Sequence, residues 1–117
     1  MIVYGIPNCD TVAKARKWLD SKSVDYRFHD FREDGIDKKL LSGWIDKLGW
    51  EIVINKRSTT WKQLDTSVRD AMDKTSAIEI ALVQPTLVKR PVLVTGQDVL
   101  IGFKEQEYSK LFQHHTL

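Results

Sequence analysis

Residues 1–22, MIVYGIPNCDTVAKARKWLDSK, carry the most informative pattern of the chain. The run from Ile2 to Ile6 is short and apolar and is followed by Pro7, which predicts a buried β-strand. Apolar residues then recur at helical spacing from Asp10 to Lys22, which predicts an amphipathic helix. Cys9, the single cysteine of the chain, therefore lies between a strand and a helix.

A second strand is expected directly after this helix. Val24, Tyr26 and Phe28 alternate with polar residues, which is typical of a strand with one solvated face. A strand, a helix and a strand in this order normally give two parallel strands with a right-handed crossover.

The last part of the chain returns to strands. After Pro91, the segments VLVT and VLIGF flank the turn GQD, which predicts an antiparallel hairpin. A final helix is expected from about Lys104 to His114, with its apolar side chains facing inward.

The middle of the chain has helical signals only. Leu40, Leu41, Trp44, Ile45 and Leu48 lie on one helical stripe, which Gly49 closes. Three shorter helices are expected after it, one following Ser58, one capped by Thr66 or Ser67, and one capped by Ser76 and ended by Pro85.

These elements predict an α/β protein with a thioredoxin-like fold, that is, a mixed four-stranded sheet with flanking helices. An all-helical insertion separates the second strand from the third. We expect residues 1–117 to form a single domain, in which residues 1–34 and 85–117 make the thioredoxin-like core and residues 35–84 the insertion.

Composition narrows the function classes. The chain has 18 basic and 16 acidic side chains, and this small excess of +2 does not indicate nucleic acid or a membrane surface as the main partner. No apolar run approaches the roughly 20 residues of a membrane span, and no secretion signal is evident. A lone cysteine fits a reducing compartment, so we expect a cytoplasmic protein.

The predicted position of Cys9 suggests a reactive thiol. The first turn of a helix has unpaired N–H groups and a partial positive charge, and both favour the ionised thiolate over the thiol. Thr11 offers a hydroxyl donor, whereas the carboxylate of Asp10 opposes the ionisation. The alternative is a buried and unreactive cysteine that packs as a small apolar side chain.

Two motifs resemble a known family. YGIPNCDT, residues 4–11, resembles the YxxPxC opening of the arsenate reductase family related to thioredoxin, which also contains the Spx regulators. KRPVLVT, residues 89–95, is similar to the RPxxVT segment of that family. The resemblance covers essentially the whole chain, including the helical insertion. NKRSTTWKQL (55–64) and IGF (101–103) indicate the YffB-like subgroup.

The resemblance implies roles for particular residues. Cys9 would be the nucleophile that attacks an oxyanion or a disulfide and is regenerated by glutathione or a protein thiol. Arg90 would hold an anion through its N–H donors, and Pro91, implied to be cis, would place backbone groups beside the sulfur. Asn8 and Thr11, on either side of the cysteine region, complete the candidate binding residues of this segment.

The chain departs from the arsenate reductases at three places. Gly5 stands where they have a histidine, Asn55 stands at the position of a basic residue in the middle segment, and their late arginine falls near Gly102. Arg57 is a substitute for the middle residue. Because a site of three arginines is incomplete, the resemblance favours a thiol substrate, glutathione among them, over arsenate.

A further departure concerns the Spx regulators, which often have a CxxC pair. Val12 stands at the place of the second cysteine, so an internal disulfide switch is excluded. The thiol of Cys9 must then be resolved by another molecule, either glutathione or a partner thiol such as that of a glutaredoxin-type protein.

The sequence thus predicts a glutathione-dependent single-cysteine thiol reductase with no bound cofactor and no metal. Glutathione would be the reductant, and a small thiol or oxyanion the substrate. The alternative is a non-catalytic, Spx-like regulator that binds RNA polymerase.

Overall fold

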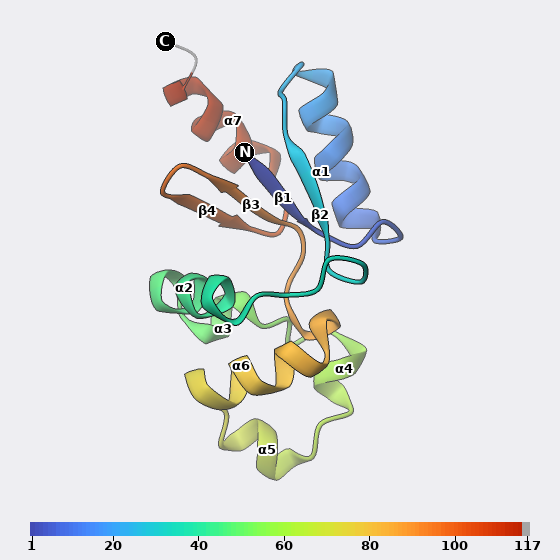
Figure 1. Ribbon diagram of the computed structural model, residues 1–117, viewed down its shortest axis with the longest axis vertical. Helices are drawn as coiled ribbons and strands as arrows, with labels where there is room; N and C mark the ends of the chain where they lie inside the picture. Colours follow the sequence, from blue (N-terminus) through green and yellow to red (C-terminus); the bar gives the residue numbers. More distant parts are fainter. Residues whose placement is uncertain (116–117) are drawn as a thin grey trace. The chain divides into compact units, whose positions relative to one another are not determined.

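The computed structural model describes the backbone of residues 1–115 and the side chains of residues 1–112 (Figure 1). Contacts within the chain divide it into two compact units. One contains Met1–Asp30 and the segment from Arg90 onward, and the other contains Phe31–Lys89.

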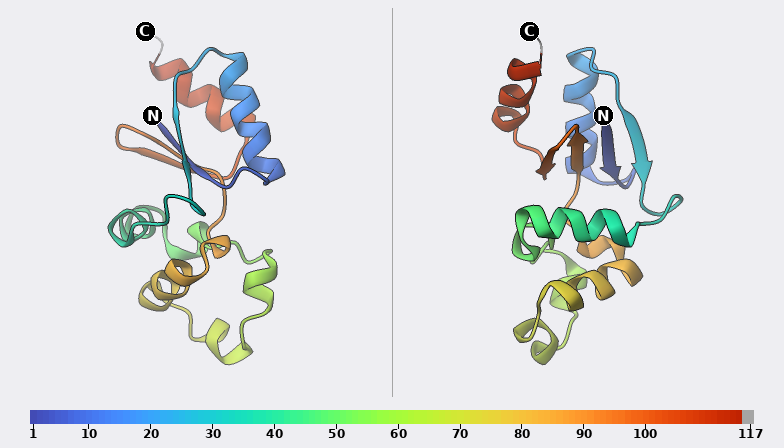
Figure 2. Two further views of the ribbon diagram at one scale, coloured as in Figure 1. Left: turned by 45° about the vertical axis from the view of Figure 1, so that its right-hand side comes forward. Right: turned by 60° about the vertical axis from the view of Figure 1, so that its left-hand side comes forward.

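The first unit is built on a four-stranded sheet of order β2-β1-β3-β4. Its strands are β1 (Ile2–Gly5), β2 (Arg27–Asp30), β3 (Val92–Thr95) and β4 (Asp98–Ile101). The β1 and β2 strands are parallel, whereas β3 is antiparallel to both β1 and β4. The right-hand view of Figure 2 shows the four strands in this order. The expected mixed sheet of a thioredoxin-like fold is therefore confirmed.

The second strand begins later than its alternating pattern suggests. It was expected over residues 24–28, but β2 starts at Arg27, which pairs with Ile2. Because β1 itself begins at Ile2, residues 24–26 have no neighbouring strand to pair with. Val24, Tyr26 and Phe28 nevertheless pack against the core, so the pattern located the inward side chains correctly.

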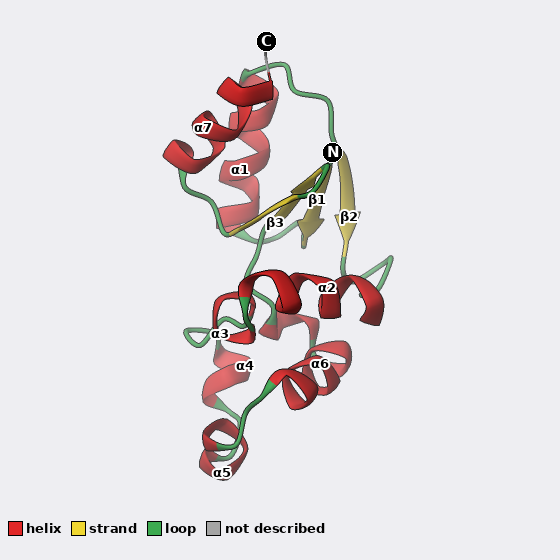
Figure 3. Ribbon diagram, turned by 90° about the vertical axis from the view of Figure 1, so that its left-hand side faces the viewer, coloured by secondary structure: helices red, strands yellow, loops and turns green. Residues whose placement is uncertain are grey.

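Two helices cover one face of this sheet, α1 (Asp10–Ser21) and α7 (Glu105–His115) (Figure 3). Five fully buried side chains form the centre of the core between the sheet and these helices: Val3, Ala15, Leu19, Leu93 and Tyr108. The helical spacing of Ala15 and Leu19 on α1 places both on the buried face.

The second unit consists of short helices. They are α2 (Lys38–Leu48), α3 (Trp50–Val53), α4 (Thr59–Lys62), α5 (Thr66–Asp70), α6 (Lys74–Val83) and the 3₁₀ helix η1 (Pro85–Leu87). The expected helical insertion is present, and α3 and η1 are additional to the helices expected in it. Ile54 and Val88 form an isolated antiparallel bridge, which joins the residue after α3 to the residue after η1.

The cap of α6 differs from the expected one. The helix begins at Lys74 and not after Ser76, because the carboxylate of Asp73 accepts a hydrogen bond from the Ser76 amide at 2.9 Å. The Ser76 hydroxyl accepts one in return from the Asp73 amide at 3.0 Å. Ser76 is thus the third residue of a capping box and not the cap itself.

Among the helices described here, none has the length and apolar character that crossing a membrane requires.

Candidate functional site

Cys9 occupies the N-cap position of α1. Its backbone is extended, with φ −107° and ψ 124°, and its carbonyl accepts the first helical hydrogen bond, from the Ala13 amide at 2.9 Å. Cys9 is a free cysteine of intermediate burial, and its side chain makes no capping hydrogen bond to the first turn. The expected position between strand and helix is confirmed.

The end of β1 and the first turn of α1 approach each other closely. Gly5 is buried, and a Cβ atom built on it would lie 2.8 Å from Cγ2 of Val12. Real Cβ atoms essentially never come so close to another heavy atom. A histidine, which the arsenate reductases carry here, therefore has no space while Val12 is present.

Pro91 follows a cis peptide bond, as the family resemblance implied. Tyr4 pairs with Val92 across the β1–β3 ladder. Arg90 and Pro91 therefore enter β3 at the edge of the sheet where β1 ends and the chain turns toward Cys9. The topology brings the two motifs that resemble the family to this one end of the strands.

The guanidinium of Arg90 has unused hydrogen-bond donors. Its Nε and Nη1 atoms are buried and have no hydrogen-bond partner within the described part of the chain. Burying the donors of a charged group without acceptors is energetically unfavourable. The described part of the chain therefore supplies no acceptor for these two nitrogens.

The two polar residues near the cysteine are both exposed. Asn8 lies in the turn that precedes Cys9, and Thr11 is the second residue of α1. Their positions agree with the expected loop, and their binding roles stay predictions.

Arg57 belongs to the second unit, so its part in a common site with Cys9 also stays a prediction. Its side chain is exposed, and its amide donates to Oδ1 of Asn55 at 3.0 Å. The Asn55 amide in turn donates to the carbonyl of Leu87 at 2.8 Å. Asn55, at the place where arsenate reductases have a basic residue, thus stabilises the loop through its side chain and its backbone.

Lys56, beside it, packs on aromatic rings, a feature that the sequence did not indicate. Its Nζ lies 5.0 Å from the ring centre of Trp50 and 5.8 Å from that of Trp61. The two indoles are themselves stacked at 6.3 Å. Cation–π contacts of this kind orient the lysine on the insertion surface.

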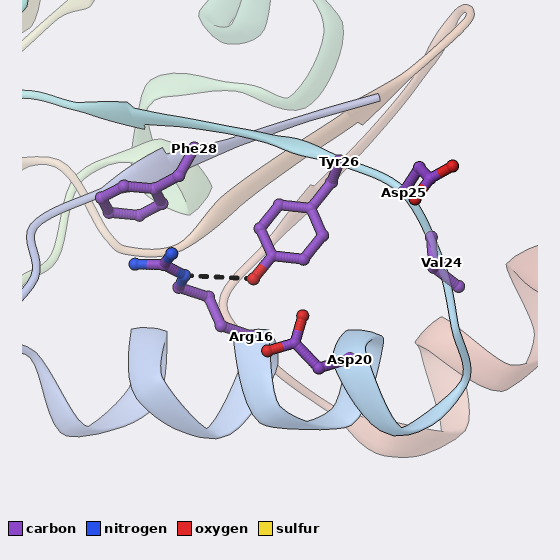
Figure 4. A pocket seen from close by; sticks show the side chains of 6 residues that line it. All are labelled: Arg16, Asp20, Val24, Asp25, Tyr26 and Phe28. Carbon is purple, nitrogen blue, oxygen red and sulfur yellow. Dashed lines mark hydrogen bonds between the residues drawn. The ribbon is translucent and has the colours of Figure 1, made fainter.

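A shallow hollow of about 330 Å³ lies between α1 and β2, and none of the candidate residues lines it (Figure 4). Arg16 crosses it, donating from Nε to Oη of Tyr26 at 3.1 Å. The Arg16 guanidinium also lies 4.1 Å from the ring centre of Phe28. The Arg16 guanidinium is therefore already engaged by Tyr26 and Phe28. We conclude that these contacts attach the β2 segment to α1 and do not form a ligand site.

The chain combines three features: a thioredoxin-like sheet, a cysteine at the N-terminus of the first helix, and a cis-proline before the adjacent strand. They define a class of thioredoxin-like proteins with one cysteine at this position. The profile of the ArsC family matches residues 4–111. The chain belongs to the ArsC family.

Several relatives match this chain over nearly its whole length. An uncharacterised protein of Haemophilus influenzae is 46% identical over 94% of this chain and 96% of its own. The solved structure of a YffB protein has a TM-score of 0.90 and 44% identity, covering 93% of this chain and 96% of its own. An arsenate reductase-related protein from Brucella melitensis has a TM-score of 0.78 and 41% identity, covering 96% and 93%.

More distant relatives are named as regulators. A global transcriptional regulator Spx of Streptococcus pyogenes is 28% identical over 103 residues, which cover 86% of this chain and 76% of its own.

Proposed function

We propose that this protein is a single-cysteine thiol reductase that uses glutathione as its reductant. One observation carries the proposal. Cys9 occupies the N-cap position of α1, after the end of β1, and Arg90, whose Nε and Nη1 are buried without a partner among the described residues, lies just before the β3 strand that pairs with β1. A nucleophile and an unsatisfied cationic donor at one edge suit a substrate that contains both a reactive sulfur and an anionic group.

The helix supports the nucleophile. The amides of residues 10–12, in the first turn of α1, have no acceptor within the helix and carry its positive end. Helix N-termini favour anionic groups in general, and the thiolate is the reactive form of cysteine.

The reaction is a thiol–disulfide exchange. The Cys9 thiolate attacks one sulfur of a disulfide that contains glutathione, the old S–S bond breaks, and the other sulfur leaves as a thiolate. Cys9 and glutathione are then joined in a mixed disulfide. A second glutathione thiolate attacks the glutathione sulfur of this bond, releasing oxidised glutathione and the Cys9 thiolate. Because the chain has one cysteine, the second thiol comes from another molecule.

Arg90 would hold a carboxylate of glutathione during both steps. Charge-assisted hydrogen bonds from a guanidinium to a carboxylate are strong and directional. Its unpaired Nε and Nη1 would gain acceptors only when the substrate is bound. An oxyanion such as arsenate would use the same donors, but the missing basic residues at Asn55 and Gly102 favour the thiol substrate.

Intact-protein mass spectrometry after incubation with oxidised glutathione tests the proposal. We expect one glutathione to be added at Cys9, and the adduct to disappear when reduced glutathione is supplied. The same chain unfolded in denaturant is the control for rate, since its Cys9 has no helix beside it. At neutral pH the folded protein should react faster; equal rates, or no adduct, would reject the proposed function.

The second candidate is a regulator that binds RNA polymerase without catalysis. The relatives named Spx and the missing basic residues support it. A pull-down with the wild-type protein and with Cys9→Ser separates the two. Equal recovery of polymerase subunits by both proteins, together with no glutathione adduct, would favour the regulator.

A further inference from the structure

We infer that Gly5 and Val12 form a steric pair that positions Cys9 relative to Arg90. The inference rests on the proposed function for its meaning, since it concerns where the nucleophile stands in the proposed site. It assigns a positioning role to two residues that carry no reactive group.

The contact leaves no room for a side chain at residue 5. A Cβ there would meet Cγ2 of Val12 at 2.8 Å and Cγ1 at 3.3 Å. Val12 is fully buried, and a β-branched side chain on a helix is confined to essentially one rotamer. Val12 therefore cannot turn aside, and any added atom at Gly5 must push the first turn of α1 away from β1. Gly5 is required for this close approach and not for a left-handed backbone, which it does not have.

The contact links the two halves of the proposed site. Val12 lies three residues after Cys9, and the hydrogen bond from the Ala13 amide to the Cys9 carbonyl ties the cysteine to the same turn. Gly5 ends β1, whose pairing with β3 positions the start of β3, directly after Arg90. Any separation of the first turn from β1 therefore changes the position of Cys9 relative to Arg90.

The geometry also shows how the pair can be relieved. The Cβ of Val12 would lie 3.6 Å from a Cβ at residue 5, which is an ordinary van der Waals contact. Alanine at position 12 removes both Cγ atoms, so alanine becomes acceptable at position 5. The two positions are thus interdependent: a side chain at residue 5 requires a smaller one at residue 12.

A double-mutant cycle tests the pair with Gly5→Ala, Val12→Ala and the double variant. The measurement is the rate of mixed-disulfide formation with oxidised glutathione, alongside the pH profile of Cys9 alkylation by iodoacetamide. Gly5→Ala should slow disulfide formation about tenfold or more in the wild-type background, because small displacements of reacting groups have large effects. In the Val12→Ala background the same change should slow it less than about threefold.

If Gly5→Ala only weakened the fold, thermal stability would fall, but the slowing of disulfide formation would not depend on the residue at position 12. Equal slowing by Gly5→Ala in both backgrounds, or an unchanged rate and pH profile in the single variant, would overturn the inference. If Gly5→Ala does not fold, the comparison is made entirely in the Val12→Ala background. There Gly5→Ala should react like its parent, whereas Gly5→Val, which restores the overlap, should slow the reaction.

The proposed function and the positioning role fail in different ways. If wild-type Cys9 forms no glutathione adduct, the proposed function is lost, yet iodoacetamide alkylation still reports on the cysteine. Backbone amide chemical shifts of residues 8–12 then test the displacement directly. Shifts that stay unchanged in Gly5→Ala would reject the pair whatever the substrate is.

Discussion

The backbone amide of Gly102 donates a hydrogen bond to the carbonyl of Pro91 at 2.8 Å. This bond joins the IGF segment, which begins with the last residue of β4, to the RP motif before β3. It thereby connects two segments that both resemble the same family. Gly102 is buried and has φ +78°, a left-handed conformation that strongly favours glycine. An arginine at this place would be strained.

Gly102→Ala should therefore lower the free energy of unfolding by about 1–2 kcal/mol, the approximate penalty for an L-residue in this region. Gly43→Ala is the matched control. Gly43 lies inside α2 and has open space around its missing Cβ, so alanine there should stabilise by up to about 1 kcal/mol through helix propensity. Denaturant titration of both variants measures the difference. Equal effects of the two substitutions would contradict the backbone argument.

Arg90→Ala should weaken the binding of glutathione. Loss of charge-assisted hydrogen bonds predicts an affinity about 10- to 100-fold lower. The measurement is the degree to which bound S-methylglutathione protects Cys9 from alkylation by iodoacetamide. S-methylglutathione is used because it has no free thiol that would consume the iodoacetamide. Lys89→Ala removes an exposed neighbouring charge and should change protection less than about twofold.

Arg57→Ala, measured in the same assay, decides whether the second unit contributes to binding. A loss comparable with that of Arg90→Ala would assign Arg57 to the site as the substitute for the basic residue that Asn55 replaces. Full protection by S-methylglutathione in Arg90→Ala would remove Arg90 from it.

Tyr108→Phe should leave stability unchanged or raise it by about 1 kcal/mol, because an unpaired buried hydroxyl is removed. The ring of Tyr108 is fully buried against Trp18 and Phe103, and its Oη has no hydrogen-bond partner among the described residues. Tyr26→Phe is the control: its Oη accepts from Arg16, so its loss should destabilise by up to about 1 kcal/mol. Stabilisation by both changes, or a clear loss in Tyr108→Phe, would contradict this assignment.

The same tyrosine predicts a pH dependence in alkaline solution. Burial, followed by the nearby Glu107 carboxylate, raises the pKa of Tyr108 well above its ordinary value of 10.0. The unfolded chain then releases this proton near pH 10 while the folded chain keeps it. Stability is unaffected by Tyr108 below that pH and falls as the pH rises above it. Urea unfolding between pH 8 and pH 11 should show a steeper decline in wild type than in Tyr108→Phe.

Asp73→Asn should remove an acid-sensitive part of the stability of the insertion. Hydrogen bonds from the Ser76 amide, and then from its hydroxyl, lower the pKa of Asp73 below its ordinary value of 3.8. This contribution is present above pH 3.8 and is lost as the pH falls through the lowered pKa. Asparagine also caps helices but does not titrate. Thermal unfolding from pH 7 to pH 2 should show a smaller decline in the variant, and an equal decline would contradict the role.

Local patterns were sufficient for much of the fold. The short apolar run of residues 2–6 and the helical spacing of residues 10–22 predicted β1, α1 and the place of Cys9 between them, and all three are observed. The hairpin around Gly96 followed from its turn residues and the flanking β-branched runs. The limits of β2 did not follow, because they depend on the length of β1, and the Asp73 cap of α6 was missed in favour of Ser76.

Some features depend only on residues that are neighbours in the sequence and can therefore be recognised without the structure. They are the identity and order of the elements, the lone thiol at a helix start and the RP motif. The clash that keeps residue 5 a glycine, the unpaired nitrogens of Arg90 and the bond between Gly102 and Pro91 are properties of residues distant along the chain. Steric overlap and burial depend on interatomic distances across the packed core, and only the tertiary structure sets those distances.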